Sequence, residues 1–342
     1  MVRMKIAQIY RLPVVLMLGI GIAMPLKGSP APAQPANGSV TSAEPQLVVI
    51  DTDIGDDIDD AYALALALRS PELHILGVTT TFGDTEMRAR LLDRYLAAVG
   101  RSDIPVARGP ATKTDNRMTQ KPYALQAPDK KHADGVEFLL EQINKHPGQV
   151  TLIAIGPLST VGAAIARDPA TFRKLKRVVM MGGSIYRGYD SGMNTFLPRA
   201  LRSPDAEWNI NRDPADAQAL FAAGVPIFMM PLDSTQVHLE AAEREKIFAH
   251  GSPLTDQLTL LYHQWMGGSD SHSPSPTLFD PVAVTYALRP DLCPATPMRI
   301  VVDDKGFTRP VDGTPNSQVC LKSDEKGFLE LLLGRILGDQ AR

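Results

Sequence analysis

The sequence predicts an α/β fold with a mainly parallel open sheet, helices on both faces and a small late strand pair. Short apolar runs alternate with helix-like stretches over most of the chain, and polar motifs follow the ends of the runs. With 342 residues, 44% of them hydrophobic, the chain can bury one large α/β core or two smaller ones. Such alternation is typical of strands joined by crossover helices.

The first 33 residues predict an export signal peptide. Basic residues Arg3, Lys5 and Arg11 precede an apolar stretch at 12–26, and small residues follow it, with cleavage expected after Ala33. Pro and Gly interrupt the stretch, which favours a removable signal over the alternative of an uncleaved anchor. We therefore expect a periplasmic or secreted protein in which 34–45 is a flexible leader and 46–342 is the folded domain.

The expected elements follow one another in a regular order after the leader. Strand and helix pairs are expected at 47–50 with 60–69, 75–79 with 86–99, and 150–155 with 161–167. A strand at 177–181, an irregular stretch, a helix at 214–223, a strand at 226–230 and helices at 239–250 and 253–265 come next. Residues 267–278 are too polar and proline-rich for regular structure and predict a surface loop or lid. The order ends with a helix at 281–288, a strand pair at 298–302 and 318–322, and a helix at 325–337.

Six aspartates fall within ten residues directly after the first expected strand, in the segment DTDIGDDIDD at 51–60. Like charges gathered at the end of a buried strand raise each other's pKa and cost free energy unless a cation neutralises them. Carboxylate oxygens without a His or Cys nearby favour Ca²⁺ or Mg²⁺ over zinc. Capping the following helix would need one or two of these carboxylates, so capping alone does not explain six.

Charge and cysteine content restrict the partners and the compartment. Without the four basic residues of the signal, the formal net charge falls from −3 to −7, which argues against a nucleic-acid ligand. Cys293 and Cys320 are the only cysteines. Either they pair, as an oxidising compartment allows, or they are two separate buried thiols.

Further motifs follow the ends of later strands, where ligands bind in open α/β sheets. They are GVTTTFGD at 77–84, IPVARG at 104–109, IGPLST at 155–160, VVMMGGS at 178–184, AEWNINRDPADA at 206–217 and FDPVAV at 279–284. Together with DTDIGDDIDDA at 51–61, this ordered set resembles the inosine/uridine-preferring nucleoside hydrolase family. The resemblance covers nearly everything after the leader.

The resemblance implies a Ca²⁺-dependent enzyme that hydrolyses the N-glycosidic bond of ribonucleosides to ribose and free base. Residue by residue, it implies that the metal ligands are Asp53, Asp60, the carbonyl of Ser159 and Asp280. It also makes Asp53 the general base that deprotonates a water. It places four side chains against the sugar, where carboxylates favour an oxocarbenium-like transition state: Asp59, Asp84, Glu207 and Asn209. Several of these residues, taken alone, would fit a cap or a turn, and their shared order carries the assignment.

Three positions depart from the pattern of that family. The opening loop is two residues longer than the commonest form, so Asp56 or Asp57 is an alternative for the roles given to Asp59 or Asp60. Asp84 stands where the family usually has Asn, and a carboxylate donates no hydrogen bond unless it is protonated. Phe279 stands where many pyrimidine-using members have a His proposed to protonate the departing base.

Phe279 cannot supply a proton, which leaves two routes for the departing base. Either His272 or His263, near the expected lid, supplies the proton, or the base leaves through stacking on Trp265 or Tyr262 with protonation from solvent. Purine-specific relatives use the second route. Our hypothesis is therefore a preference for purine nucleosides.

Two other functions stay open at this point. Asp51 and Asp53 superficially fit a DxD-type phosphatase, although Gly55 stands where such enzymes want Thr or Val. An exported nucleoside- or ribose-binding protein that lacks turnover is the non-enzyme alternative, and Phe279 favours it. In every case we expect a small-molecule partner, no nucleic acid and no stable membrane association after signal removal, with a homo-oligomer left open.

Overall fold

The computed structural model describes residues 44–190, 198, 202–268 and 273–338. The expected signal, the leader up to residue 43 and His272 lie outside the described residues. The described residues belong to one compact unit. Within them, no helix combines the length and the apolar character that crossing a bilayer requires.

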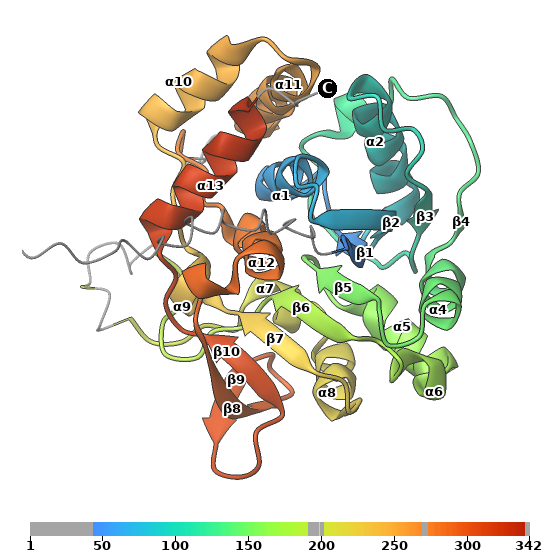
Figure 1. Cartoon of the computed structure of the whole chain (residues 1–342), viewed down its shortest axis with the longest axis vertical. Coiled ribbons are helices and arrows are strands. Elements are labelled where there is room, and N and C mark those ends of the chain that lie inside the picture. The colour runs from blue at the N-terminus through green and yellow to red at the C-terminus, as the bar shows by residue number, and fades with distance from the viewer. Residues whose placement is uncertain (1–43, 191–197, 199–201, 269–272, 339–342) are drawn as a thin grey trace, which may run out of the picture. The chain divides into compact units, whose positions relative to one another are not determined.

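Ten strands of the described residues form a single sheet, in the order β4-β3-β2-β1-β5-β6-β7-β10-β8-β9 (Figure 1). The strands are β1 (Gln46–Thr52), β2 (Leu73–Thr80), β3 (Val106–Arg108), β4 (Ala133–Asp134), β5 (Thr151–Ala154), β6 (Arg177–Met181), β7 (Ile227–Met230), β8 (Ala295–Val302), β9 (Thr308–Val311) and β10 (Ser317–Cys320). All neighbours from β4 to β10 in this order pair in parallel, and β8 pairs antiparallel with both β10 and β9. The expected mainly parallel sheet is confirmed.

Helices cover both faces of this sheet. They are α1 (Asp59–Leu68), α2 (Thr85–Ala98), α3 (Lys121–Ala124), α4 (Gly135–Lys145), α5 (Ser159–Arg167), α6 (Pro169–Phe172), α7 (Trp208–Asn211), α8 (Pro214–Ala222), α9 (Leu232–Thr235), α10 (Ala241–His250), α11 (Pro253–Gly268), α12 (Phe279–Leu288), the 3₁₀ helix η3 (Pro290–Leu292) and α13 (Glu325–Leu337). One core contains side chains of α1, α2 and α10 to α13, and the other contains side chains of α4, α5, α6 and α8 (Figure 1).

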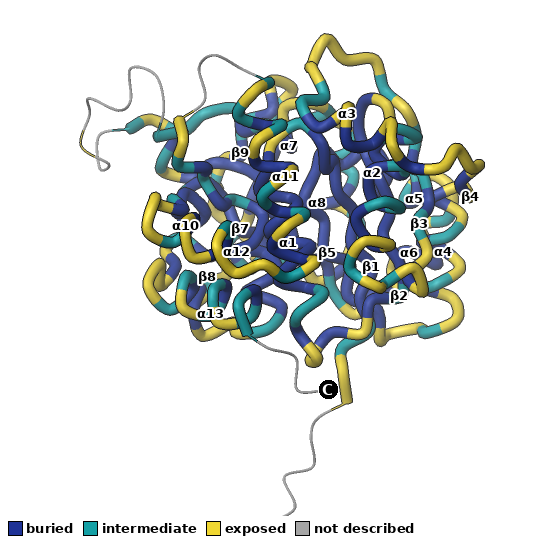
Figure 2. Tube along the Cα trace, turned by 90° about the horizontal axis from the view of Figure 1, so that it is seen from above, coloured by how far each residue is buried: buried dark blue, intermediate teal, exposed yellow. Residues whose placement is uncertain are grey.

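Strand β1 shows how the sequence creates these two cores. Side chains of a strand alternate between its faces, so Val48 and Ile50 enter the first core while Val49 enters the second. All three are almost completely buried, and Figure 2 shows the central strands buried beneath exposed outer loops. A strand buried on both faces explains the continuous apolar run before the aspartates.

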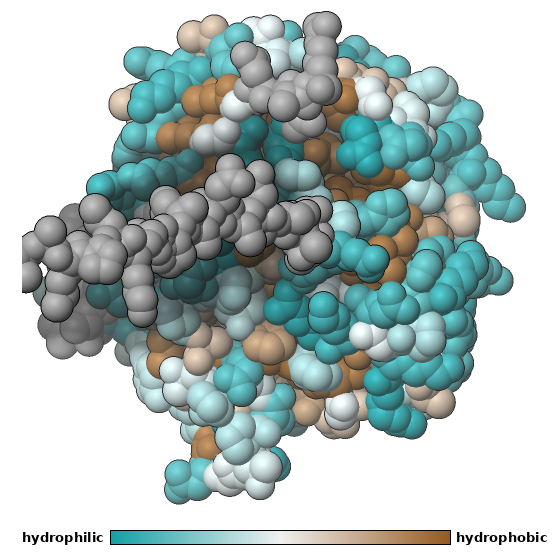
Figure 3. Space-filling view, viewed as in Figure 1, coloured by the Kyte–Doolittle hydropathy of each residue, from teal (hydrophilic) through white to brown (hydrophobic). Residues whose placement is uncertain are grey.

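The molecular surface carries no single apolar face in the view of Figure 3, where apolar residues are scattered among hydrophilic ones. The large apolar side chains exposed among the described residues are Leu125, Tyr186, Leu260, Val301 and Val311. Single exposed apolar side chains are normal on protein surfaces.

The structure confirms most of the expected elements and adds several. The strands expected between 47 and 230 correspond to β1, β2, β5, β6 and β7. No element was expected at α4, although Val136, Leu139, Leu140 and Ile143 have the spacing of an amphipathic helix. Strands β3 and β4 have three and two residues, too few for an alternating pattern to be visible. Of the expected lid at 267–278, residues 267 and 268 belong to the end of α11, and residues 269–272 lie outside the described residues.

The late strand pair differs from its expected form. β8 and β10 pair as expected, in antiparallel direction, but β9 lies between them in the chain and pairs with β8. β10 also pairs in parallel with β7, so the pair extends the main sheet. Cys293 and Cys320 form a disulfide with an S–S distance of 2.08 Å, which decides between the two alternatives for these cysteines.

The register of the central strands brings the motifs to one edge of the sheet. Asp51 of β1 lies opposite Thr79 of β2 and Ala154 of β5. Because these strands are parallel, the segments that follow them start side by side. The aspartate-rich segment therefore lies between the TFGD and IGPLST motifs.

Candidate active site

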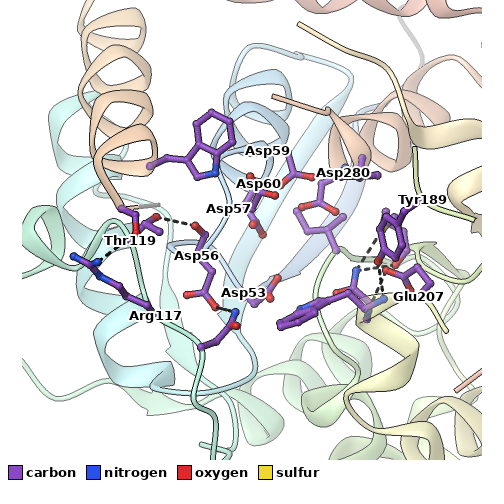
Figure 4. Close-up of a pocket in the computed structure, with 18 residues that line it drawn as sticks. Asp53, Asp56, Asp57, Asp59, Asp60, Arg117, Thr119, Tyr189, Glu207 and Asp280 are labelled. Carbon is purple, nitrogen blue, oxygen red and sulfur yellow. Dashed lines mark hydrogen bonds between the residues drawn. The ribbon is translucent and has the colours of Figure 1, made fainter. Parts of the chain in front are cut away.

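A cavity of about 610 Å³ opens at this edge of the sheet (Figure 4). Its lining is dominated by carboxylates and aromatic rings, and it consists of Asp53, Asp56, Asp57, Asp59, Asp60, Asn116, Arg117, Thr119, Ile155, Met181, Tyr189, Glu207, Trp208, Asn209, Trp265, Gly268, Phe279 and Asp280. Of the eight residues expected to bind the metal or the sugar, all but Ser159 and Asp84 line the cavity. Trp265, expected near the departing base, lines it as well. The cavity has the size of a small-molecule site.

Four aspartates form what we call the acidic side of the cavity: Asp53, Asp59, Asp60 and Asp280. Carboxylate oxygens of Asp59, Asp60 and Asp280 lie within 4.8 Å of one another, and all three residues are buried. Figure 4 shows Asp53 facing the same space as these three. Three buried carboxylates at this separation fit a hard cation with oxygen ligands.

The starts of α1 and α12 show how far helix capping accounts for these aspartates. Ile58 precedes α1 and Leu278 precedes α12, and neither helix receives a hydrogen bond from a side chain at its cap position. The backbone N–H of Asp280, in the first turn of α12, donates to Asp59 Oδ2 at 3.2 Å. Capping therefore accounts for one bond of Asp59 but not for Asp60 or Asp280.

Burial and mutual repulsion set the protonation of the acidic side. Burial raises the pKa of Asp53 to about 7, Arg88 opposes that rise, and the charge of Asp56 adds to it. Burial, together with the neighbouring aspartates, raises the pKa of Asp59, Asp60 and Asp280 well above the ordinary range. These shifts are those of carboxylates crowded in a desolvated place, where the positive charge of Arg88 offsets burial and mutual repulsion only in part.

Glu207 and Asn209 stand across the cavity from the aspartate-rich segment, as Figure 4 shows for Glu207. Glu207 caps α7 by accepting from the N–H groups of Asn209 and Ile210, and it accepts from Gly183 N at 2.8 Å. Burial raises its pKa to about 7. Asn209 donates to the carbonyl of Met181 at 3.2 Å. Each of the two side chains thus makes hydrogen bonds to the backbone and also lines the cavity.

The segment after β5 approaches the acidic side through Gly156. A Cβ added at Gly156 would lie 2.8 Å from both the N and Oδ1 atoms of Asp53, so only glycine fits there. Ser159 begins α5 three residues later, is 7% exposed, and its hydroxyl contacts Thr81 Oγ1 at 2.8 Å. Ser159 is absent from the cavity lining, so the role of its carbonyl stays a prediction.

Two expected site residues lie away from the cavity. Asp84 is an exposed cap of α2, and its carboxylate accepts from Met87 N at 3.0 Å. His263 is an exposed residue of α11 that contacts the rings of Phe248 and Tyr262. Neither lines the cavity, so the structure does not support a sugar contact for Asp84 or proton donation by His263. Tyr262 is also outside the lining and bonds through its hydroxyl to Pro274 O.

The longer opening loop places Asp56 and Asp57 in the cavity without displacing Asp59 or Asp60. Asp56 forms a salt bridge of 2.9 Å with Arg88 and accepts from Asn116 Nδ2 at 3.0 Å. Asp57 Oδ1 accepts from Ile58 N. Because Asp59 and Asp60 form the close group with Asp280, they fit the metal and sugar roles better than Asp56 and Asp57 do.

Sequence reasoning missed the side of the cavity that we call the loop side: Asn116, Arg117 and Thr119. Figure 4 shows Arg117 and Thr119 on the opposite side of the aspartates from Tyr189 and Glu207. These residues come from the segment between β3 and β4, which is irregular apart from the short helix α3 and carries no chemical motif. Tyr189 was missed as well, and its ring packs edge to face on Phe279 with centroids 6.1 Å apart.

Comparisons with known proteins show which sequences and structures this chain is similar to. The family model of inosine-uridine preferring nucleoside hydrolases matches residues 48–330. The chain is 31% identical to uridine nucleosidase 1 of Arabidopsis thaliana, over 75% of this chain and 78% of the relative. It is 30% identical to the pyrimidine-specific ribonucleoside hydrolase RihA of Citrobacter koseri, over 84% and 97%. Among solved structures, a plant nucleoside hydrolase superposes with a TM-score of 0.75 at 26% identity, covering 86% of this chain and all of that one.

Proposed function

Since the chain belongs to the inosine-uridine preferring nucleoside hydrolase family and acts on N-ribosyl bonds, we propose that it hydrolyses ribonucleosides to ribose and free base with the help of bound Ca²⁺. The observation that carries this proposal is the buried group of Asp59, Asp60 and Asp280, whose carboxylate oxygens lie within 4.8 Å of one another. Asp53 lines the same cavity.

The donor chemistry of the acidic side supports calcium as the metal. In this proposal Asp53, Asp60, Asp280 and the carbonyl of Ser159 hold the ion, all through oxygen atoms. When bound, Ca²⁺ supplies the positive charge that orients a vicinal diol and lowers the pKa of a water. The same charge would offset the repulsion that raises the pKa values of these buried carboxylates.

The protein groups around the sugar have distinct roles in the proposal. Asp53 accepts a proton from the attacking water as the general base. Asp59, Glu207 and Asn209 bind sugar hydroxyls. Glu207 Oε1 accepts from one backbone group, Asn209 N, which leaves a lone pair for a hydroxyl donor. As the bond to the base breaks, the positive charge that develops on the ribose is stabilised by these carboxylates.

The departing base is the step in which this chain differs from many pyrimidine-using members. Phe279 lines the cavity at the position of their His, and Trp265 lines it as well. We propose that the base leaves by stacking on an aromatic ring with protonation from solvent, and that purine nucleosides are preferred. The names of the two relatives above refer to uridine and to pyrimidine ribonucleosides. Purine and pyrimidine nucleosides must therefore be compared directly as substrates.

The test is turnover of inosine and uridine by the purified protein with and without Ca²⁺, followed by a reducing-sugar assay. We expect calcium-dependent release of ribose, with inosine used faster. A strong uridine preference would refute the purine hypothesis. Isothermal titration that detects binding of inosine without turnover would favour the binding-protein alternative, and turnover of a chromogenic phosphate ester would favour the phosphatase.

We also propose that the protein is exported to the periplasm or secreted. The basic and apolar pattern of residues 1–33 supports this proposal, and so does the disulfide between Cys293 and Cys320, since such bonds persist in oxidising compartments. N-terminal sequencing of the mature protein should begin near Gln34. A mature chain that begins at Met1 and fractionates with the cytosol would contradict export.

A further inference from the structure

Arg88 is an arginine of α2 that lies almost completely buried behind the acidic side, with 2% of its surface exposed. Its Nε donates to the carbonyl of Phe82 at 2.8 Å. Its Nη1 donates to the carbonyls of Asp53 and of Ile54, the latter at 3.0 Å. Its Nη2 forms the salt bridge with Asp56. A planar guanidinium can hold several acceptors in fixed directions at once, which a lysine ammonium on a flexible stem cannot.

The segment that Arg88 holds is the irregular part of the opening loop, where no strand or helix fixes the backbone. Among the described residues, Arg88 donates to the carbonyl groups of residues 53 and 54, and Thr119 and Gln120 donate to those of residues 55 to 57. Arg88 is therefore the donor that fixes the backbone of Asp53 itself. Through its salt bridge with Asp56, Arg88 also holds the part of the opening loop that is longer than in the commonest family form.

We propose that Arg88 is a positioning residue, which sets the backbone of Asp53 and so the place of its carboxylate in the acidic side. This inference rests on the proposed function, because it concerns the roles of Asp53 as metal ligand and general base. Small misplacements of reacting groups cost rate steeply. Residues that orient metal ligands affect metal affinity as well as activity.

The test compares Arg88→Lys and Arg88→Gln with matched variants at Arg94. Arg94 lies on the same helix, donates to Tyr123 O at 3.0 Å and stacks on the ring of Tyr123, but makes no contact with the opening loop. Calcium affinity is measured by isothermal titration of metal-free protein, and kcat and KM are measured with inosine. Circular dichroism and thermal unfolding establish that each variant is folded.

We expect Arg88→Lys to weaken calcium binding by about tenfold to a hundredfold, because lysine keeps the charge but lacks the planar guanidinium that holds several acceptors. Its kcat should fall by a similar factor while KM changes by less than about threefold. Arg94→Lys should stay within about twofold of the unmodified protein in all three quantities. A folded Arg88→Lys variant with unchanged calcium affinity and kcat would overturn the proposal.

Loss of the fold in both Arg88 variants would also overturn it, because Arg88 would then be a folding residue. The calcium titration needs no turnover, so it separates this inference from the proposed function. If the unmodified protein binds calcium but hydrolyses no nucleoside, the proposed function fails, while weaker calcium binding by Arg88→Lys still supports the positioning role.

Discussion

The acidic side of the cavity rests on β1, α1 and α12, whereas the loop side lies between β3 and β4, in a stretch that is irregular apart from the short helix α3. Each of the four aspartates of the acidic side is at most 8% exposed. On the loop side, Asn116 and Arg117 are exposed and Thr119 is partly buried. A substitution on the acidic side should therefore change electrostatic interactions strongly, and one on the loop side weakly, because such interactions are stronger between buried groups than between exposed ones.

This difference suggests a division of labour within one site. The acidic side gathers the groups that a metal-assisted hydrolysis requires, on elements that the sheet holds in place. The loop side gathers neutral and cationic groups that can contact whichever base is attached to the sugar. Changes on the acidic side should therefore affect turnover of every nucleoside, and changes on the loop side should affect mainly the choice between nucleosides.

The largest expected effect is that of Asp53→Ala. The substitution removes the proposed base and a proposed metal ligand, so kcat/KM for inosine should fall by about a thousandfold or more. The fold should persist, because Asp53 lies in a loop and its buried carboxylate repels its neighbours. Arg117→Ala on the loop side is the control and should change the same quantity far less. An Asp53→Ala variant with unmodified turnover would exclude Asp53 as the base.

Thermal unfolding with and without calcium should distinguish substitutions on the acidic side from those on the loop side. In chelator, Asp60→Asn should raise the Tm by about 2 °C or more, since burial and the neighbouring carboxylates raise the pKa of Asp60 and its carboxyl therefore costs stability at neutral pH. Calcium at a hundredfold excess over its Kd should stabilise the unmodified protein by about 2.7 kcal/mol and so raise its Tm. The Tm of Asp60→Asn should rise much less.

Thr119→Ser on the loop side is the control for the calcium experiment. It should leave the response of the Tm to calcium unchanged, because serine keeps the hydroxyl that donates to the carbonyls of Gly55 and Asp56. An Asp60→Asn variant that gains as much stability from calcium as the unmodified protein would contradict the assigned ligand.

The same difference explains what the sequence could and could not predict. The acidic side follows strands whose apolar runs are easy to recognise, and parallel pairing of β1 with β2 and β5 brings their motifs together. The loop side comes from a stretch whose position depends on long-range contacts, such as Gln120 N with the carbonyl of Gly55. No periodic pattern encodes such contacts, so Asn116, Arg117 and Thr119 were missed.

Asp84 shows a second limit, in which one residue type in one sequence position fits two roles. Its place in TFGD next to the acidic side suggested a sugar contact, yet its carboxylate caps α2 and is exposed. A cap and a ligand use the same residue types in the same sequence position, at the junction of strand and helix. Only the direction of the side chain separates them, and the sequence does not contain that direction.

A smaller effect is expected from Arg117→Met on the loop side. Arg117 lines the cavity and donates to Gly268 O at 3.3 Å, and its guanidinium suits the oxygen and ring-nitrogen acceptors of a base. We expect kcat/KM for inosine to fall by up to about tenfold, with a changed ratio of inosine to uridine and an unchanged Tm. Lys113→Met, in the same stretch but outside the lining, is the control. Equal losses for inosine and uridine would contradict a role in base selection.

The smallest expected effect is a pH dependence at the end of the stretch that carries the loop side. His132 is buried and contacts two carboxylates of α2, Glu86 at 2.5 Å and Asp93 at 2.8 Å, which in turn meet Arg108 and Lys130. Burial disfavours the charged imidazole, but the bonds to Asp93 and Glu86 outweigh burial and raise the pKa of His132.

A histidine whose pKa is raised in the folded state stabilises the protein fully below its unfolded pKa of 6.5, and this contribution is lost as pH rises through the folded pKa. The Tm difference between the unmodified protein and His132→Gln should therefore be largest near pH 6 and shrink toward pH 8. His74→Gln, at an exposed position of β2, should show no such trend. A difference for His132→Gln that stays constant over this range would mean that the neutral imidazole anchors the stretch as well as the charged one.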